Sequence, residues 1–198
     1  MTAALTPPRP LEAGDDATGF DCGRDALNHW FRRHAWRNQQ SDVSRTSVAC
    51  DPVTGTIVGY VSLSAAHSER AWWPKAQHRN RPDPVPAALL GQLAVDLRWQ
   101  GRRVARSLMF YALTTAVRFS KEVACFCVLT HPLDDDVRTL HRSFGFEDLP
   151  FDPARSMGVR MADLVHDGFG AEDLGGINRC GATRPGVLAA GRARGQVP

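Results

Sequence analysis

The stretch that most restricts how this chain folds is an apolar run that ends in a short basic loop and continues as a helix. Leu93–Val95 closes the apolar run, Gly101 lies in the loop, and helical spacing begins at about Val104. The first amides of a helix have no partner within it, and together with the helix dipole they bind anions. Small residues at Gly101 and Ala105 let a pyrophosphate approach the backbone closely. A strand, an anion-binding loop and a helix in this order predict a sheet with helices packed against it.

Arginines gather in two parts of the chain. One group surrounds the basic loop and the other lies near the beginning: Arg98, Arg102, Arg103 and Arg106, then Arg24, Arg32, Arg33, Arg37 and Arg45. The net charge of the whole chain is only +3, so the position of these residues matters more than their number. Such clusters suit the phosphates of a cofactor or of a nucleic acid. An ordinary basic turn and a solvated helix face remain open as alternatives.

The order of the predicted elements indicates the fold class. The patterns predict a helix around Leu27–Ala35, a hairpin of Thr46–Asp51 and Thr56–Ala65, a strand at Ala88–Asp96, a helix at Val104–Phe119, a strand at Val123–Thr130, a helix at Asp134–Phe144 capped by Asp134, and a final strand. A strand–helix–strand unit implies a parallel pair with a right-handed crossover. The predicted fold is therefore α/β (α+β), with a mixed sheet and helices on both faces.

Composition favours one domain in a reducing compartment. The chain has 198 residues, of which 43% are hydrophobic, enough for a single core. We predict one domain over residues 1–164 and a disordered Gly/Ala/Arg-rich tail over Val165–Pro198. The five cysteines show no paired spacing, so we expect free thiols and no metal. No segment has the length of a membrane span, and we expect a cytoplasmic protein without a membrane partner.

Two motifs resemble those of the GCN5-related N-acetyltransferases, the GNAT family. Leu93–Leu108 is similar to its acetyl-CoA motif, a strand followed by Gln/Arg-x-x-Gly-x-Gly/Ala. Gln100 matches the first position and Ala105 the last, whereas Arg103 stands where the family usually has glycine. Asp134–Phe146 resembles the family's second motif and ends in the same Gly-Phe pair. The resemblance implies a GNAT fold, in which acetyl-CoA lies where two parallel strands splay apart.

Further motifs resemble one branch of that family, the acetyltransferase toxins of bacterial toxin–antitoxin pairs. Phe20–Trp30 is similar to their Phe-x-Cys-Gly-x-x-x-Leu-Asn-x-Trp opening, and Pro86–Asp96 to their approach to the cofactor loop. This resemblance implies a toxin that acetylates the amino group of aminoacyl-tRNA and blocks translation, with a ribbon–helix–helix antitoxin as a partner. The oligomeric state stays open, a homodimer included. A small-amine N-acetyltransferase and a non-catalytic acyl-CoA binding module are the alternatives.

The resemblance also assigns site residues. Those expected to hold acetyl-CoA are Leu93, Ala94, Val95, Gln100, Gly101, Arg102, Arg103, Val104, Ala105, Arg106 and Asp134. Arg32, Arg33, Arg37 and Arg45 are the candidates for RNA contact, with a solvated surface as the alternative. His141 stands where many relatives have the tyrosine that protonates the leaving sulfur, so it is the candidate catalytic residue. A surface histidine that only packs near the cofactor is the competing interpretation.

Overall fold

A computed structural model describes residues 5–170 of the chain. Within them lies a seven-stranded sheet in the order β1-β2-β3-β4-β5-β7-β6. The strands are β1 Arg9–Pro10, β2 Arg45–Cys50, β3 Ile57–Ser68, β4 Val85–Val95, β5 Cys127–Thr130, β6 Glu147–Asp148 and β7 Met157–Arg160. β4 and β5 are parallel and the other neighbouring pairs are antiparallel. The mixed sheet confirms the predicted fold class.

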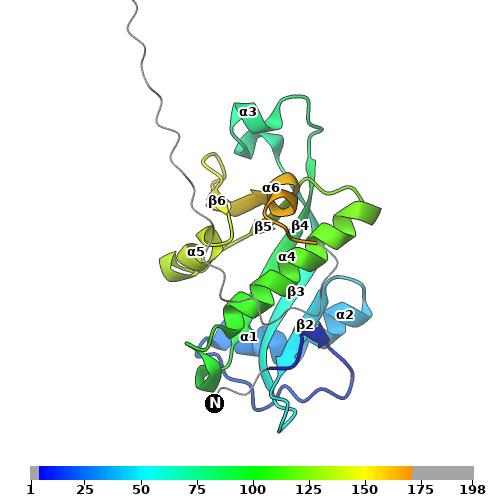
Figure 1. The fold of residues 1–198 in the computed structure, drawn as a ribbon, viewed down its shortest axis with the longest axis vertical. Coiled ribbons are helices and arrows are strands. Elements are labelled where there is room, and N and C mark those ends of the chain that lie inside the picture. Colours follow the sequence, from blue (N-terminus) through cyan, green and yellow to red (C-terminus); the bar gives the residue numbers. More distant parts are fainter. Residues whose placement is uncertain (1–4, 171–198) are drawn as a thin grey trace, which may run out of the picture.

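Helices cover both faces of this sheet, as predicted (Figure 1). They are α1 Asp25–Trp30, a π-helical turn Phe31–Ala35, α2 Trp36–Gln40, α3 Lys75–His78, α4 Val104–Glu122, α5 Asp135–Arg142 and α6 Met161–His166, with 3-10 turns at Arg70–Trp72 and Leu97–Trp99. Neighbouring residues of β3 distinguish the two faces. A Cβ at Gly59 would meet Leu108 of α4, whereas the Tyr60 ring stacks on Phe31, which follows α1. α4 therefore packs on one face and α1 on the opposite face.

One predicted boundary differs from the structure for a local reason. The strand predicted at Val123–Thr130 begins only at Cys127, because α4 continues to Glu122 and its end is closed by the Val123 amide on the Phe119 carbonyl. Asp21 has the residue type of a helix cap, yet α1 begins at Asp25. The Asp21 carboxylate instead accepts hydrogen bonds from the Gly23 amide and the Asn28 side chain.

The folded domain extends beyond the boundary predicted at Leu164. α6 continues through His166, and the Phe169 ring lies 5.2 Å from that of Phe110 on α4. Gly170 lies so close to Val117 that no Cβ would fit there. The disordered tail predicted from Val165 is thus wrong for its first residues, because a short helix and one aromatic side chain are enough to anchor them. The remainder, 171–198, lies outside the described residues.

Candidate active site

The site is built on two parallel strands that separate. β4 and β5 pair from Ala87 opposite Cys127 to Leu90 opposite Thr130. Beyond Leu90, β4 runs on to Val95 while β5 ends. The register between β3 and β4 shifts at this point, since Leu63 pairs with Leu90 and Ser62 with Gln92. The bulge at Gly91 bends β4 where the pairing with β5 stops. The edge of β4 after Leu90 is therefore open.

Backbone direction decides which predicted residues face this open edge. The Asp96 amide donates to the Val58 carbonyl of β3, so the backbone groups of Asp96 point toward β3. Backbone groups point alternately to the two sides of a strand in an antiparallel pair. The backbone groups of Ala94 therefore also point toward β3, and those of Leu93 and Val95 point away from it. The side chain of Ala94 is buried in the cluster beneath α1. Leu93 and Val95 thus present backbone groups to the open edge, and Ala94 does not.

The loop after β4 is held by Gln100. Its side-chain amide donates to the Val95 carbonyl at 3.0 Å and to the Cys22 carbonyl at 3.1 Å. Gln100 therefore connects the loop to β4 and to Phe20–Trp30, the opening segment that resembles the toxins. The loop then turns through two left-handed residues, Gly101 at φ 74° and Arg103 at φ 64°, before α4 begins at Val104. The left-handed backbone explains why relatives prefer glycine at the position of Arg103.

Replacing Gly101 with alanine should lower the free energy of unfolding by about 1 kcal/mol, because a positive φ disfavours any Cβ. A Cβ there would meet no atom within 4 Å, so the loss comes from backbone conformation alone. We expect acetyl-CoA affinity to fall as well, since the loop leads into the first turn of α4. Chemical denaturation and calorimetry measure the two effects. Gly19→Ala is the matched control, because Gly19 has open space and an ordinary φ. Equal losses in both variants would contradict this role of the loop.

The arginines around the loop lie against aromatic rings. The Arg102 guanidinium lies 5.0 Å from the centre of the Trp99 ring, and that of Arg106 lies 5.0 Å from the centre of the Phe144 ring. Arg106 also donates to the Ser143 hydroxyl, so it connects the first turn of α4 to the end of α5. Both side chains are exposed near the unpaired amides at the start of α4. Their charges add to the helix dipole at that end.

Asp96 organises the same region, a role that the sequence patterns did not reveal. It is 1% exposed, and its carboxylate accepts from the Arg98 side chain at 2.8 and 2.9 Å. It also accepts from the backbone amides of Arg98 and Asp21. The Arg98 hydrogen bonds are the main cause that holds the pKa of Asp96 below its ordinary value. Its place directly after a buried strand and before an arginine was the signal that could have identified it.

Asp134, predicted to contact the cofactor, has two partners within the protein. Its carboxylate caps α5 by accepting from the Val137 amide at 2.9 Å. The other oxygen pairs with Arg24 at 2.5 Å. Arg24 belongs to the opening segment, so this ion pair joins that segment to the start of α5. The predicted capping of the helix by Asp134 is confirmed.

His141 is buried, in contrast to the surface histidine that was the competing interpretation. It is 3% exposed, and its Nδ1 lies 2.7 Å from the Val137 carbonyl. A carbonyl only accepts, so Nδ1 carries the hydrogen. Nε2 lies 3.4 Å from the Thr130 hydroxyl at the end of β5. Burial lowers the pKa of His141, so the neutral ring is the main form at neutral pH, with its lone pair on Nε2. In this form Nε2 accepts a proton rather than donating one.

The predicted RNA-binding arginines do not form one group. Arg32 donates to the Phe20 carbonyl at 2.8 Å, and Arg45 pairs with Asp42 and donates to the Gln39 carbonyl. Among the described residues, the guanidinium groups of Arg33 and Arg37 make no hydrogen bond or ion pair. Of these four arginines, Arg33 and Arg37 are therefore the two available to a partner.

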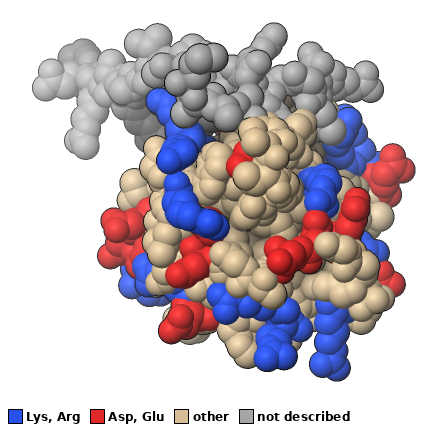
Figure 2. Space-filling view, turned by 90° about the horizontal axis from the view of Figure 1, so that it is seen from below, with Lys and Arg blue, Asp and Glu red and all other residues tan. Residues whose placement is uncertain are grey.

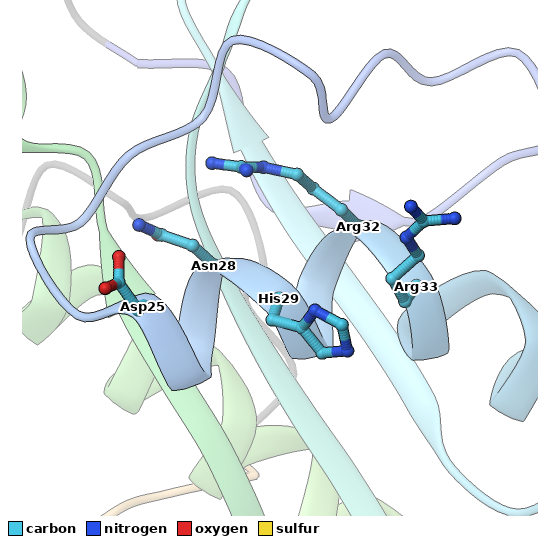
Figure 3. Close-up of a pocket in the computed structure, with 5 residues that line it drawn as sticks. All are labelled: Asp25, Asn28, His29, Arg32 and Arg33. Carbon is cyan, nitrogen blue, oxygen red and sulfur yellow. The ribbon is translucent and has the colours of Figure 1, made fainter.

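α1 carries a shallow cavity of about 320 Å³. It is lined by Asp25, Asn28, His29, Arg32 and Arg33 (Figure 3). Asn28 is buried and holds the Cys22 amide, so it shapes the wall rather than offering a free group. His29 and Arg33 project from the same side of the helix, as residues four apart do (Figure 3). The cavity therefore presents two guanidinium groups, an imidazole and the Asp25 carboxylate to solvent.

Charge is distributed unevenly over this end of the molecule. Figure 2 shows Lys and Arg side chains in several groups with acidic side chains between them, rather than one continuous basic face.

Within residues 5–170 no helix is long and apolar enough to cross a membrane. The same residues contain no cluster of His, Cys, Asp and Glu that could hold a metal ion.

Comparison with known proteins agrees with this geometry. Residues 16–146 match the sequence model of the acetyltransferase (GNAT) family. A tRNA-acetylating toxin of Mycobacterium tuberculosis is 35% identical over 150 residues, which cover 76% of this chain and 89% of the toxin.

Two solved structures have the same fold. AtaT in complex with acetyl-methionyl-tRNAfMet has a TM-score of 0.76 at 26% identity, covering 82% of this chain and 98% of AtaT. A mutant of AtaT bound to the C-terminus of the antitoxin AtaR has a TM-score of 0.69 at 25% identity, covering 82% of this chain and 95% of the other. The splayed strands, the loop before α4 and these matches lead to one conclusion: the chain belongs to the acetyltransferase (GNAT) family and has the GNAT fold that its motifs predict.

Proposed function

We propose that this protein is a toxin that transfers the acetyl group of acetyl-CoA to the amino group of the amino acid on a charged tRNA, and thereby blocks translation. The observation that carries the proposal is the open edge of β4 beyond Leu90, which leads to the unpaired amides of α4, in a chain 35% identical to a tRNA-acetylating toxin. Bound acetyl-CoA supplies an activated thioester. The backbone groups of Leu93 and Val95 would hold its pantetheine arm, and the start of α4 its pyrophosphate.

The substrate places modest demands on the protein. A free α-amino group titrates near about 8, and esterification of the neighbouring carboxyl lowers this value further. A substantial fraction of such amines is neutral at pH 7. An enzyme for this substrate therefore needs to orient the amine and remove one proton, without a strongly perturbed base.

The surface formed by α1, the π-helical turn and α2 favours charged tRNA over a small cationic amine. Arg33 and His29 border the cavity on α1, and Arg37 lies one turn further along. Cationic groups attract a phosphate backbone and repel a polyamine. A non-catalytic acyl-CoA binding module remains the third candidate, because Arg103 and His141 replace the family's usual residues. Transfer of label to any amine would exclude it.

Two partners follow from the proposal. AtaT binds the C-terminus of its antitoxin AtaR, and by analogy we expect a ribbon–helix–helix antitoxin for this protein. Charged tRNA and acetyl-CoA are both found in the cytoplasm, which is the proposed site of action. A homodimer is compatible with the proposal but is not needed for it.

Charge reversal at Arg33, in the π-helical turn, and at Arg37, in α2, tests the RNA surface. Phosphate contacts depend on salt, so the Arg33→Glu/Arg37→Glu double variant should weaken tRNA affinity at least tenfold and reduce its salt dependence. Acetyl-CoA affinity should stay unchanged. The control is Arg79→Glu/Arg118→Glu, which makes the same change of charge at two exposed residues outside α1, the π-helical turn and α2. Filter binding at several salt concentrations gives both quantities. Equal losses in the two double variants would mean that only net charge matters and would contradict a binding surface at Arg33 and Arg37.

A further inference from the structure

The end of β5 directs successive side chains to opposite faces of the sheet. Thr130 faces α5, where its hydroxyl lies 3.4 Å from His141. Leu129 belongs instead to the cluster around Trp73, on the other face. Side chains alternate along a strand, so His131 follows Leu129 onto that face. Because α4 and α5 share one core cluster and α1 packs opposite α4, His131 lies on the same face as α1.

A buried serine fixes the orientation of the His131 ring. The Ser156 hydroxyl lies 2.7 Å from His131 Nδ1, and Ser156 itself is fully buried. Ser156 directly precedes Met157, the β7 partner of Thr130, so it sits opposite His131 across the strands. The register of β5 and β7 thus brings the Ser156 hydroxyl next to the His131 ring.

A buried aspartate stands behind the serine. Asp152 is 6% exposed and accepts the backbone amides of Ala154 at 2.9 Å and Ser156 at 3.0 Å. Burial alone would raise the pKa of Asp152, but hydrogen bonds from Ser156 and from the Ala154 amide outweigh it and leave the pKa below its ordinary value. Asp152 is therefore ionised at neutral pH, and an ionised carboxylate only accepts hydrogen bonds.

One tautomer of His131 leaves Nε2 free to accept a proton. A hydroxyl oxygen accepts hydrogen bonds, so Ser156 is the acceptor when Nδ1 carries the ring hydrogen. In this tautomer, neutral His131 has its lone pair on Nε2. The ring is solvent-exposed, unlike His141, and lies at the point where β4 and β5 separate.

We propose that His131 is the general base of the acetyl transfer and that Ser156 and Asp152 are its positioning residues. The inference rests on the proposed function and names the group that removes the proton. His131 Nε2 takes one proton from the substrate ammonium, and the freed nitrogen attacks the thioester carbonyl. A C–N bond forms and the C–S bond breaks, with the electron pair leaving on sulfur. The nitrogen loses its second proton as the amide forms, the thiolate gains one from water, and His131 returns its proton to solvent. The net release is one proton.

His131→Ala should lower kcat about 100-fold, within the usual range for loss of a general base. KM for acetyl-CoA and for charged tRNA should change less than twofold. Added imidazole should restore at least a tenth of the wild-type kcat, because it replaces the missing base. A purely structural role would not respond to imidazole. His166→Ala, an exposed histidine on α6, is the matched control and should keep full activity.

Ser156→Ala tests the positioning residues. It should lower kcat about tenfold through His131, and the double variant with His131→Ala should be no slower than His131→Ala alone. A kcat of His131→Ala within threefold of wild type would overturn the proposal, as would a loss that imidazole does not rescue.

The wild-type protein distinguishes a failure of this inference from a failure of the proposed function. If it labels only a free amine, the proposed substrate is wrong, and the same variants measured with that amine decide the role of His131. A wild type that labels no amine overturns both proposals.

Discussion

Replacing Asp96 with alanine should lower the free energy of unfolding by about 3 kcal/mol and weaken acetyl-CoA binding in the same variant. The carboxylate is almost completely buried and accepts four hydrogen bonds, three from Arg98 and one from the Asp21 amide. The variant leaves the Asp21 amide without its acceptor and releases the turn that leads to Gln100. The opening segment and the cofactor loop then both lose their hydrogen bonds to the Asp96 carboxylate.

Chemical denaturation measures the stability of this variant, and titration with acetyl-CoA measures the binding. Asp16→Ala is the control, because the Asp16 carboxylate is exposed and, within residues 5–170, accepts hydrogen bonds only from Thr18. It should leave both the Tm and the affinity nearly unchanged. If Asp96→Ala bound acetyl-CoA as tightly as wild type, Asp96 would not position the loop.

Asp96 should also make the free energy of unfolding depend on pH in the acidic range. The pKa of Asp96 is lower in the folded state than in the unfolded chain, where it is about 3.9. Its contribution is therefore fully present above about pH 4 and is lost as the pH falls through the folded-state value. Asp96→Ala should consequently lose less stability than wild type between neutral pH and about pH 3. Thermal unfolding at a series of pH values measures this difference, and parallel curves would contradict it.

The second large effect is expected at Gly59, where α4 packs tightly against the sheet. A Cβ there would lie 2.9 Å from Leu108, 3.0 Å from the Ala94 carbonyl and 3.3 Å from Val104. Gly59→Val should therefore lower the free energy of unfolding by about 3 kcal/mol through overpacking. It should also reduce acetyl-CoA affinity, because Val104 is the first residue of α4 and moves with it.

Gly14→Val controls for the added side chain, since a Cβ at Gly14 meets no atom within 4 Å. Its stability and affinity should remain close to wild type. A Gly59→Val variant that loses stability but keeps full affinity would show that the position of α4 does not set the cofactor site.

Local patterns were sufficient to predict most of the fold. The apolar spacing of α4 and the capping residue of α5 are properties of short segments, so their positions followed directly from the sequence. The glycine preference at Arg103 likewise reflects one left-handed backbone position. The open edge of β4 could be expected because the cofactor motif is a contiguous stretch.

Contacts between distant segments could not be predicted in this way. The Arg24–Asp134 ion pair joins residues 110 positions apart, and neither residue type indicates its partner. The burial of His141 depends on how α5 packs on the sheet, which a helical pattern does not specify. The contact of His131 could not be predicted because its orienting serine directly precedes another strand, β7. Only the register of β5 and β7 brings the two together.

The measurement that tests the central claim most directly is acetyl transfer to charged tRNA. Charged tRNA is incubated with the protein and labelled acetyl-CoA, and the ester bond is then hydrolysed under mild alkaline conditions. We predict that the label is recovered as the N-acetylated amino acid, and that uncharged tRNA and the free amino acid acquire none. Label on free amines alone, or no label despite measured binding of acetyl-CoA, would contradict the account.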